Sequence, residues 1–161
     1  MPAPRLGQGR IVDLLNTVWA DGDGVHDDLT DATEELRALR DAVRVLAADR
    51  TSDPRAIATG HEARVADAIA ALNAASARAP GWPTLDGGRL VWASQARGDE
   101  RTVGELAGEA VRFLAADPEL RACLAPRCVL YFVKDHPRRA WCSTGCGNRE
   151  RAARHYARNR A

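Results

Sequence analysis

The chain has 161 residues, of which 45% are hydrophobic, enough to bury a core without disulfides or other staples. No apolar run approaches the roughly 20 residues needed to span a bilayer, and residues 1–9 lack the apolar core of a signal peptide. We therefore expect a cytoplasmic protein without a membrane partner.

The net charge of +1 conceals two oppositely charged segments. Residues 1–120 hold 13 basic and 20 acidic side chains, a net charge of −7, whereas residues 121–161 hold 10 basic and 2 acidic ones, a net charge of +8. Such an asymmetry indicates a nucleic acid or a membrane surface as the partner of the basic segment. The alternative is a charged tail that is merely solvated.

Residues 1–118 show the periodicity of helices, with apolar residues three and four positions apart. The predicted helices cover residues 11–18, 31–46, 54–79 and 102–116. Three of them begin at capping signals, which are Asp31 with Glu34, Asp53 with Pro54, and Thr102 with Glu105. Before the last helix, Asp86-Gly87-Gly88 separates two short apolar runs and predicts a β-hairpin.

These segments carry no signature of an enzyme. The sequence contains no glycine-rich phosphate loop, no Gly-x-Ser-x-Gly and no His-Glu-x-x-His. An acidic cluster with one histidine lies within residues 21–28, but it lacks the spacing and the distal glutamate of a calcium loop. We expect this cluster to be a solvated loop and the protein not to be an enzyme.

All four cysteines lie in one stretch of 24 residues inside the basic segment. They form two close pairs. Four residues separate Cys123 from Cys128, and three separate Cys142 from Cys146. Two chelating pairs of soft thiolate ligands are typical of a tetrahedral Zn²⁺ site, and four sulfurs leave no open position for water. We therefore predict a structural zinc site. Two disulfides, an iron–sulfur cluster and redox-active thiols that release zinc are the alternatives.

The residues around the cysteines predict a small ββα module. Residues 129–133 form a β-prone apolar run directly after the first pair, and Ala140-Trp141 is expected to be the return strand that leads to the second pair. Asn148 is the expected N-cap of a terminal helix over residues 149–160.

The terminal helix presents arginines on one face, because Arg154 and Arg158 lie three and seven positions after Arg151. Another face, with Tyr156, is expected to pack on the zinc hairpin. Arginine forks match phosphate geometry and can read guanine edges. The predicted nucleic-acid contacts are these three arginines with Lys134, Arg138, Arg139 and Arg149. Alternatively, basic residues here neutralise a zinc tetrathiolate, which carries two negative charges.

Cys146-Gly147-Asn148-Arg149, preceded by Arg138-Arg139-Ala140-Trp141-Cys142-Ser143, resembles the signature of the CGNR zinc finger family. The resemblance implies that the four cysteines are the zinc ligands and that the module binds DNA. In that family the finger typically follows a mostly helical domain, the ABATE domain, assigned to stress-induced transcriptional regulators. Residues 11–18 and 39–44 resemble parts of that domain.

We therefore expect a mainly α protein with two parts. Residues 1–118 would form an ABATE-like helical domain with a short β-hairpin, and residues 119–161 a zinc-bound ββα module. The leading hypothesis is a bacterial DNA-binding transcriptional regulator whose helical domain binds a small-molecule effector or forms a homodimer. A zinc-scaffolded protein–protein interaction module and a thiol redox sensor are the alternatives.

Overall fold

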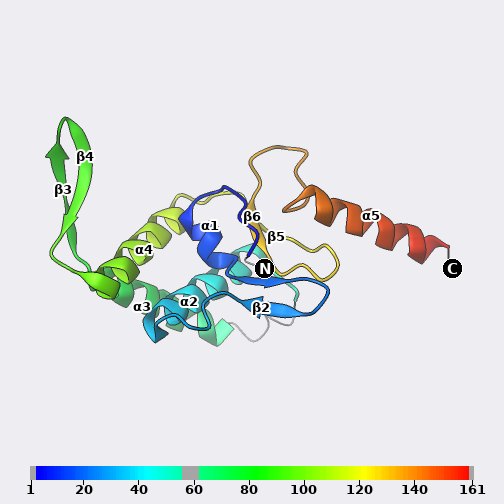
Figure 1. Cartoon of the computed structure of the whole chain (residues 1–161), viewed down its shortest axis with the longest axis horizontal. Coiled ribbons are helices and arrows are strands. Elements are labelled where there is room, and N and C mark those ends of the chain that lie inside the picture. The colour runs from blue at the N-terminus through cyan, green and yellow to red at the C-terminus, as the bar shows by residue number, and fades with distance from the viewer. Residues whose placement is uncertain (1–2, 56–61, 160–161) are drawn as a thin grey trace.

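The computed structural model describes residues 3–55 and 62–159, in which helices are joined by three two-stranded antiparallel hairpins (Figure 1). The helices are α1 (Arg10–Leu15), α2 (Glu34–Thr51), α3 (Glu62–Ala77), α4 (Gly98–Ala115) and α5 (Thr144–Arg158). The hairpins are β1 (Val18–Ala20) with β2 (Val25–Asp27), β3 (Gly81–Asp86) with β4 (Arg89–Ser94), and β5 (Leu120–Ala122) with β6 (Tyr131–Val133). The mainly α prediction is thus confirmed only in part, because the hairpins make the architecture mixed. No helix in the described ranges is long and apolar enough to cross a membrane.

Helices α1 to α4 share one apolar core. The predicted stripe of the second helix is buried at Leu39 and Val43, which meet Val103 and Ala107 of α4 in the same cluster. Helix α2 begins later than predicted because Thr33 caps it, its hydroxyl accepting a hydrogen bond from a backbone N–H of the first turn at 3.4 Å. The helical periodicity of the sequence therefore predicted the buried face of α2 correctly but placed its first residue too early.

The predicted start of the third helix at Pro54 is wrong. Asp53 does not cap a helix, because its side chain is fully buried and forms an ion pair with Arg55. Helix α3 begins at Glu62, and the predicted helical residues 56–61 lie outside the described ranges. Helix α4 begins at Gly98, before the predicted start at Thr102.

The first helix is shorter than predicted. Its periodicity continued to Val18, but α1 ends at Leu15 and Val18 opens strand β1. Asn16 is the C-cap of α1, and its side-chain amide forms two hydrogen bonds with the backbone of Tyr131 on β6. The Trp19 ring on β1 stacks on His26 of β2, with ring centroids 4.3 Å apart. Tertiary contacts therefore overrode the local helical pattern.

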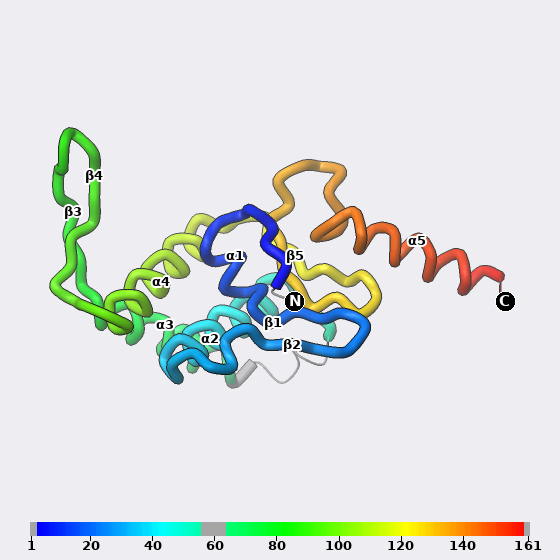
Figure 2. The backbone as a smooth tube through the Cα atoms, in the orientation of Figure 1, coloured from blue at the N-terminus to red at the C-terminus, as the bar shows by residue number. Residues whose placement is uncertain are grey.

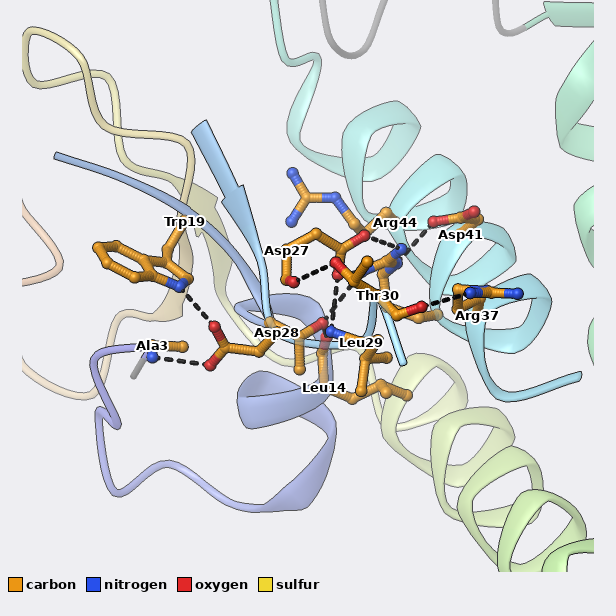
Figure 3. A network of polar contacts seen from close by, with 12 residues as sticks. Ala3, Leu14, Trp19, Asp27, Asp28, Leu29, Thr30, Arg37, Asp41 and Arg44 are labelled. Carbon is orange, nitrogen blue, oxygen red and sulfur yellow. Dashed lines mark hydrogen bonds and ion pairs between the residues drawn. The ribbon is translucent and has the colours of Figure 1, made fainter. Parts of the chain in front are cut away.

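The acidic cluster of residues 21–28 is tied into the fold by specific contacts (Figure 3). Asp27 accepts two hydrogen bonds from the buried Arg40 of α2, at 2.8 and 2.9 Å, and these bonds lower the pKa of Asp27. Asp28 accepts a hydrogen bond from the Trp19 indole at 2.8 Å and another from the Ala3 backbone N–H at 2.8 Å. These carboxylates fasten the β1–β2 hairpin to α2 and to the N-terminal segment.

The predicted hairpin around Asp86-Gly87-Gly88 is confirmed. Strands β3 and β4 pair from Gly81 with Ser94 to Asp86 with Arg89. Gly87 and Gly88 have φ values of 53° and 79°, which the two-residue turn requires and other residues rarely adopt. The hairpin projects from the helices at the end of the molecule opposite α5 (Figure 1).

The β5–β6 hairpin packs on the helical body through a two-point backbone clamp. The buried Asn16 side chain donates to the Tyr131 carbonyl at 2.9 Å and accepts from the Tyr131 N–H at 2.8 Å. Leu120 and Tyr131 belong to the same apolar cluster as α2 and α4. The first half of the C-terminal segment is therefore part of the body's core.

Replacing Asn16 tests this clamp. Asn16→Ala leaves one buried donor and one buried acceptor of Tyr131 without a partner, which costs about 1–3 kcal/mol for each group. Urea unfolding followed by circular dichroism should show a free energy of unfolding lower by about 3 kcal/mol. Thr30→Ala, which removes an exposed hydroxyl bonded to the Asp27 carbonyl at 2.8 Å, is the control and should cost far less. Equal losses in both variants would contradict the clamp.

Candidate metal centre

The first cysteine pair lies in the loop that joins β5 and β6. Cys123 directly follows β5, and its N–H donates to the Leu130 carbonyl at 2.9 Å, so the ladder continues past the strand. The Cys128 N–H donates to the Ala125 carbonyl at 2.9 Å, and Arg127 takes a positive φ of 61° to close the turn. The predicted strand at 129–133 is confirmed at Tyr131–Val133, but the predicted return strand at Ala140-Trp141 is wrong. Strand β6 pairs instead with β5, which precedes it in the chain, so the two strands of this hairpin flank the loop that carries the first cysteine pair.

The second pair lies at the start of α5. After β6 the chain loops outward and returns to α5 beside the loop of the first pair (Figure 2). Ser143 caps α5 by accepting the Cys146 N–H at 3.2 Å, so the helix begins before the predicted cap at Asn148. Cys146 therefore lies in the first turn of α5. Gly147 lies against Trp141, where a Cβ would come within 3.1 Å of the indole.

The four sulfurs converge from these two loops into one cluster. All four Sγ atoms lie within 4.8 Å of one another, and all four cysteines are buried and free of disulfides. The Cys128 and Cys142 sulfurs are 3.8 Å apart, and those of Cys142 and Cys146 are 3.3 Å apart. Tetrahedral Zn²⁺ with bonds of about 2.3 Å places its sulfurs roughly 3.8 Å apart. The donor set and its spacing therefore fit a single zinc ion, as the sequence predicted.

Thiol electrostatics also favour a cation at the centre. Hydrogen bonds from Cys128 and Cys142 lower the pKa of Cys123 to about 2, and sharing a proton with Cys123 raises the pKa of Cys128 to about 12. The hydrogen bond with Cys123 likewise raises the pKa of Cys142. Without a counter-ion, one thiolate thus keeps its neighbours protonated. A divalent ion replaces these protons and allows all four sulfurs to ionise.

Three arginines frame the cluster from three directions. Arg55 of the helical body donates to the carbonyls of both first-pair cysteines, at 3.0 Å for Cys128 and 3.4 Å for Cys123. Arg139 donates to the Cys142 carbonyl at 3.0 Å, and its guanidinium lies 5.3 Å from the centre of the Phe132 ring. Arg149 reaches the Cys146 sulfur at 2.9 Å. Arg55 and Arg139 are also paired with the carboxylates of Asp53 and Asp135, so the charge of Arg149 would most directly offset that of a zinc tetrathiolate.

A buried ion pair holds Arg55 in place. The Arg55 guanidinium binds Asp53, whose carboxylate also accepts the Tyr131 hydroxyl at 2.8 Å. Burial alone would raise the pKa of Asp53, but the hydrogen bonds from Arg55 and Tyr131 lower it below its ordinary value. Burial raises the pKa of Tyr131 to about 12, so its hydroxyl stays a donor. This network was not predicted, because Asp53 before a proline matched a helix cap and no local pattern relates it to Tyr131.

The predicted nucleic-acid residues divide into inward and outward groups. Lys134 pairs with Glu119 at 3.2 Å, while Arg139 and Arg149 contact the zinc cluster. Arg149 is exposed as well, so exposure alone does not separate the groups. The outward group, whose members are exposed and form no hydrogen bond to the cysteines within the described part of the chain, consists of Arg138, Arg151, Arg154 and Arg158. Within it, Arg154 pairs with Glu150 at 3.0 Å, one turn away on the same helix.

Helix α5 does not pack on the zinc hairpin, contrary to the prediction. Its buried residues are Cys146 and Gly147 in the first turn, whereas Ala153 and Tyr156 are exposed, Tyr156 by 67%. The helix leaves the cluster and extends away from the body (Figure 1). Its attachment therefore rests on the metal ligands and the cap at its first turn.

Replacing a ligand tests the zinc assignment. Cys142→Ser removes a soft sulfur donor from a site whose zinc contributes on the order of 10 kcal/mol to folding. Mass spectrometry of the metal content should show loss of an equimolar Zn²⁺, and circular dichroism should show loss of helix as α5 is released. Arg154→Ala, on the exposed part of α5, should keep its zinc. A Cys142→Ser protein that retains equimolar zinc would refute the assignment.

Removing Arg55 tests the link between the body and the first pair. Arg55→Ala combined with Asp53→Asn removes the donor to both cysteine carbonyls without leaving an unpaired buried carboxylate. Competition with a chromophoric chelator should show zinc affinity lower by about 10- to 100-fold, the usual cost of losing a group that orients metal ligands. Arg50→Ala removes a nearby pair with the exposed Asp117 and should leave the affinity unchanged. Unchanged affinity in the double variant would contradict the link.

Comparison with known proteins points to the same segment. Residues 119–159 match the family model described as CGNR zinc finger. No curated protein matches the chain. The matched segment contains the four clustered cysteines, together with the whole of β5, β6 and α5. The family match and the sulfur geometry together support a zinc-binding module at the C-terminal end of the chain.

Proposed function

We propose that the protein is a cytoplasmic, non-enzymatic transcriptional regulator that binds DNA through α5. The observation that carries the proposal is that α5 is anchored at its first turn by zinc ligands and is otherwise exposed, with arginines on one face. An exposed helix of this kind has the width to enter the major groove. The match of this segment to a zinc finger family supports the same use.

The charge distribution supports a polyanionic partner. The segment after Leu120 has a net charge of +8, while the rest of the chain has a net charge of −7. The three inward basic residues are occupied within the module, so the outward group of four arginines is the proposed DNA-contacting surface. The acidic body is repelled by phosphate, which directs DNA to the end of the molecule that carries α5.

The two ends of the outward group have different expected roles. Arg154 and Arg158 lie on the free part of α5, where guanidinium groups can reach base edges or phosphates along a groove. Arg138 and Arg151 line a surface depression of about 450 Å³ beside the helix start, together with His136. Phosphate oxygens of the DNA backbone suit such a depression, because two arginines line it and the positive end of the α5 dipole lies beside it.

The helical body is the proposed sensing part. A depression of about 330 Å³ lies among α2, α3 and α4, with a largely apolar lining that includes Leu46, Ile69 and Leu114. Polar groups at its edge include Arg50 and Asn73. A small effector with an apolar body and a polar group would suit this depression.

Fluorescence anisotropy with labelled duplex DNA at several salt concentrations tests the proposal. The zinc-loaded protein should bind, with log affinity falling linearly with log salt. Arg154→Ala combined with Arg158→Ala should weaken binding and reduce the slope by about 2 if each contacts one phosphate. Arg64→Ala, which removes an exposed arginine of α3, is the control and should leave affinity and slope unchanged.

Two results would overturn the DNA proposal. One is the absence of binding at low salt by protein that carries its zinc. The other is binding that the double variant leaves intact, because it would place the DNA elsewhere on the molecule. An arginine-dependent affinity for an acidic protein, with no affinity for DNA, would instead support the interaction-module alternative.

A further inference from the structure

The β3–β4 hairpin exposes an unusual amount of apolar surface. Leu85, Leu90 and Trp92 are exposed by 80%, 69% and 56%, and Trp82 and Val91 by 45% and 40%. An isolated two-stranded hairpin is marginally stable in water, and exposed apolar patches of this kind mark interaction sites. Within residues 3–55 and 62–159, the fold leaves these five side chains at least 40% exposed.

The strand register shows that both faces of the hairpin are apolar. Leu85 lies opposite Leu90 and Pro83 opposite Trp92, so these four share one face. Trp82, Val91 and Thr84 lie on the other face. A partner that covered only one face would leave a tryptophan in water on the other, whereas extension of the sheet at an edge brings apolar neighbours to both faces.

The two edges of the hairpin differ in their capacity to pair. Asp86 and Arg89 flank the two-residue turn and form a hydrogen-bonded pair. Going away from the turn, pairs without and with mutual backbone hydrogen bonds then alternate, so Leu85–Leu90 and Pro83–Trp92 are pairs without them. The N–H groups of Leu90 and Trp92 on β4 therefore point outward. The corresponding position on β3 is Pro83, which has no N–H and so blunts that edge. The open edge of the hairpin is β4.

The open edge also lacks the charges that normally protect a strand. Between Arg89 and Arg97 the sequence Leu-Val-Trp-Ala-Ser-Gln-Ala has no ionisable side chain. Natural edge strands that must stay unpaired usually carry lysine, inward charges or proline. Beyond Arg89 at the turn, strand β4 has none of these, so its composition favours pairing with a further strand.

We propose that β4 pairs antiparallel with β4 of a second copy of this chain, giving a four-stranded sheet across a two-fold dimer. Centred on Val91, this register places Leu90 of each copy opposite Trp92 of the other, on one face, and the two Val91 residues opposite each other on the other face. Both kinds of cross-strand pair are apolar, and the symmetry makes the Leu90–Trp92 pair occur twice, on either side of the single Val91–Val91 pair. Among the described strands, β3 is as long as β4 but is interrupted by Pro83, and the other strands have only three residues each.

The apolar area at the β4 edge is that of a weak, concentration-dependent dimer. From their exposed fractions, Leu90, Val91 and Trp92 of β4 offer on the order of 300 Å² per copy, or about 600 Å² for two copies, which is the size of a weak interface rather than of an obligate one. The hairpin and α5 lie at opposite ends of the molecule (Figure 1), so the interface leaves both zinc modules accessible. The dimer does not depend on the proposed DNA function, and its test involves no DNA.

Sedimentation velocity of the full-length, zinc-loaded protein over a concentration series tests the dimer. Wild type should dimerise, and Leu90→Lys should raise the dimer dissociation constant by on the order of 10- to 100-fold, the loss expected from one buried leucine. Leu85→Lys is the matched control, because Leu85 is even more exposed but lies on β3, one strand away from the partner. Its effect should be clearly smaller.

A cross-link tests the register separately. Val91→Cys should form a covalent dimer under mild oxidation, with the two introduced thiols linked in the peptide map and the zinc retained. Thr84→Cys, on the same face of β3, should not form one.

Three results would overturn the proposal. The first is a monomer at all concentrations, and the second is a dimer that Leu90→Lys leaves unchanged. The third is a monomeric protein whose hairpin binds phospholipid vesicles. Because Leu90 is exposed, the variant and wild type should melt at the same temperature when measured at a concentration where wild type is monomeric, which separates loss of the dimer from loss of the fold.

Discussion

Mutual repulsion among four buried thiolates is the constraint on which the C-terminal module depends. Their sulfur atoms lie within 4.8 Å of one another, where like charges cannot coexist without a cation. Because α5 buries only its first turn, the metal ligands Cys142 and Cys146 hold the helix to the rest of the module. Zinc is therefore the element that would convert an exposed basic helix into an oriented one.

The metal site is not isolated from the helical body. Asn16 clamps the backbone of Tyr131, the Tyr131 hydroxyl bonds Asp53, and Arg55 carries the contact to the carbonyls of Cys123 and Cys128. The path runs from α1 and the end of α2 to the first cysteine pair. A change in the packing of the body thus has a direct physical route to the zinc ligands, and the route is reciprocal.

The sequence located the features that depend on local spacing. Cysteine pairing predicted the sulfur cluster, helical periodicity predicted the buried stripe at Leu39 and Val43, and two glycines predicted the β3–β4 turn. These patterns carry information because ligand chelation, helix faces and tight turns are set by residues close in the chain. The basic segment was also visible, and neutralisation of the thiolates was an alternative for its basic residues that Arg149 matches, whereas the contacts of Lys134 and Arg139 were not predicted.

Long-range pairings escaped sequence reasoning. From the sequence, Ala140-Trp141 was the predicted partner strand of β6. In the structure β6 pairs with β5 instead, because Leu120 of β5 and Tyr131 of β6 are both buried in the core of the helical body. Asp53 matched a helix cap because its partner Tyr131 is 78 residues away. Tyr156 was expected to be buried from helix amphipathicity alone, but no neighbouring element covers it among the described residues. Such features depend on contacts between elements far apart in the chain, and local sequence patterns do not reveal those contacts.

The central claim is that zinc orients α5 for binding to DNA. The most direct measurement is the DNA affinity of one protein preparation with its zinc, after removal of the zinc by a chelator, and after zinc is restored. We expect a DNA affinity that falls with salt concentration, is lost on chelation of the zinc and recovers on addition of Zn²⁺. Equal DNA affinity with and without zinc would contradict it.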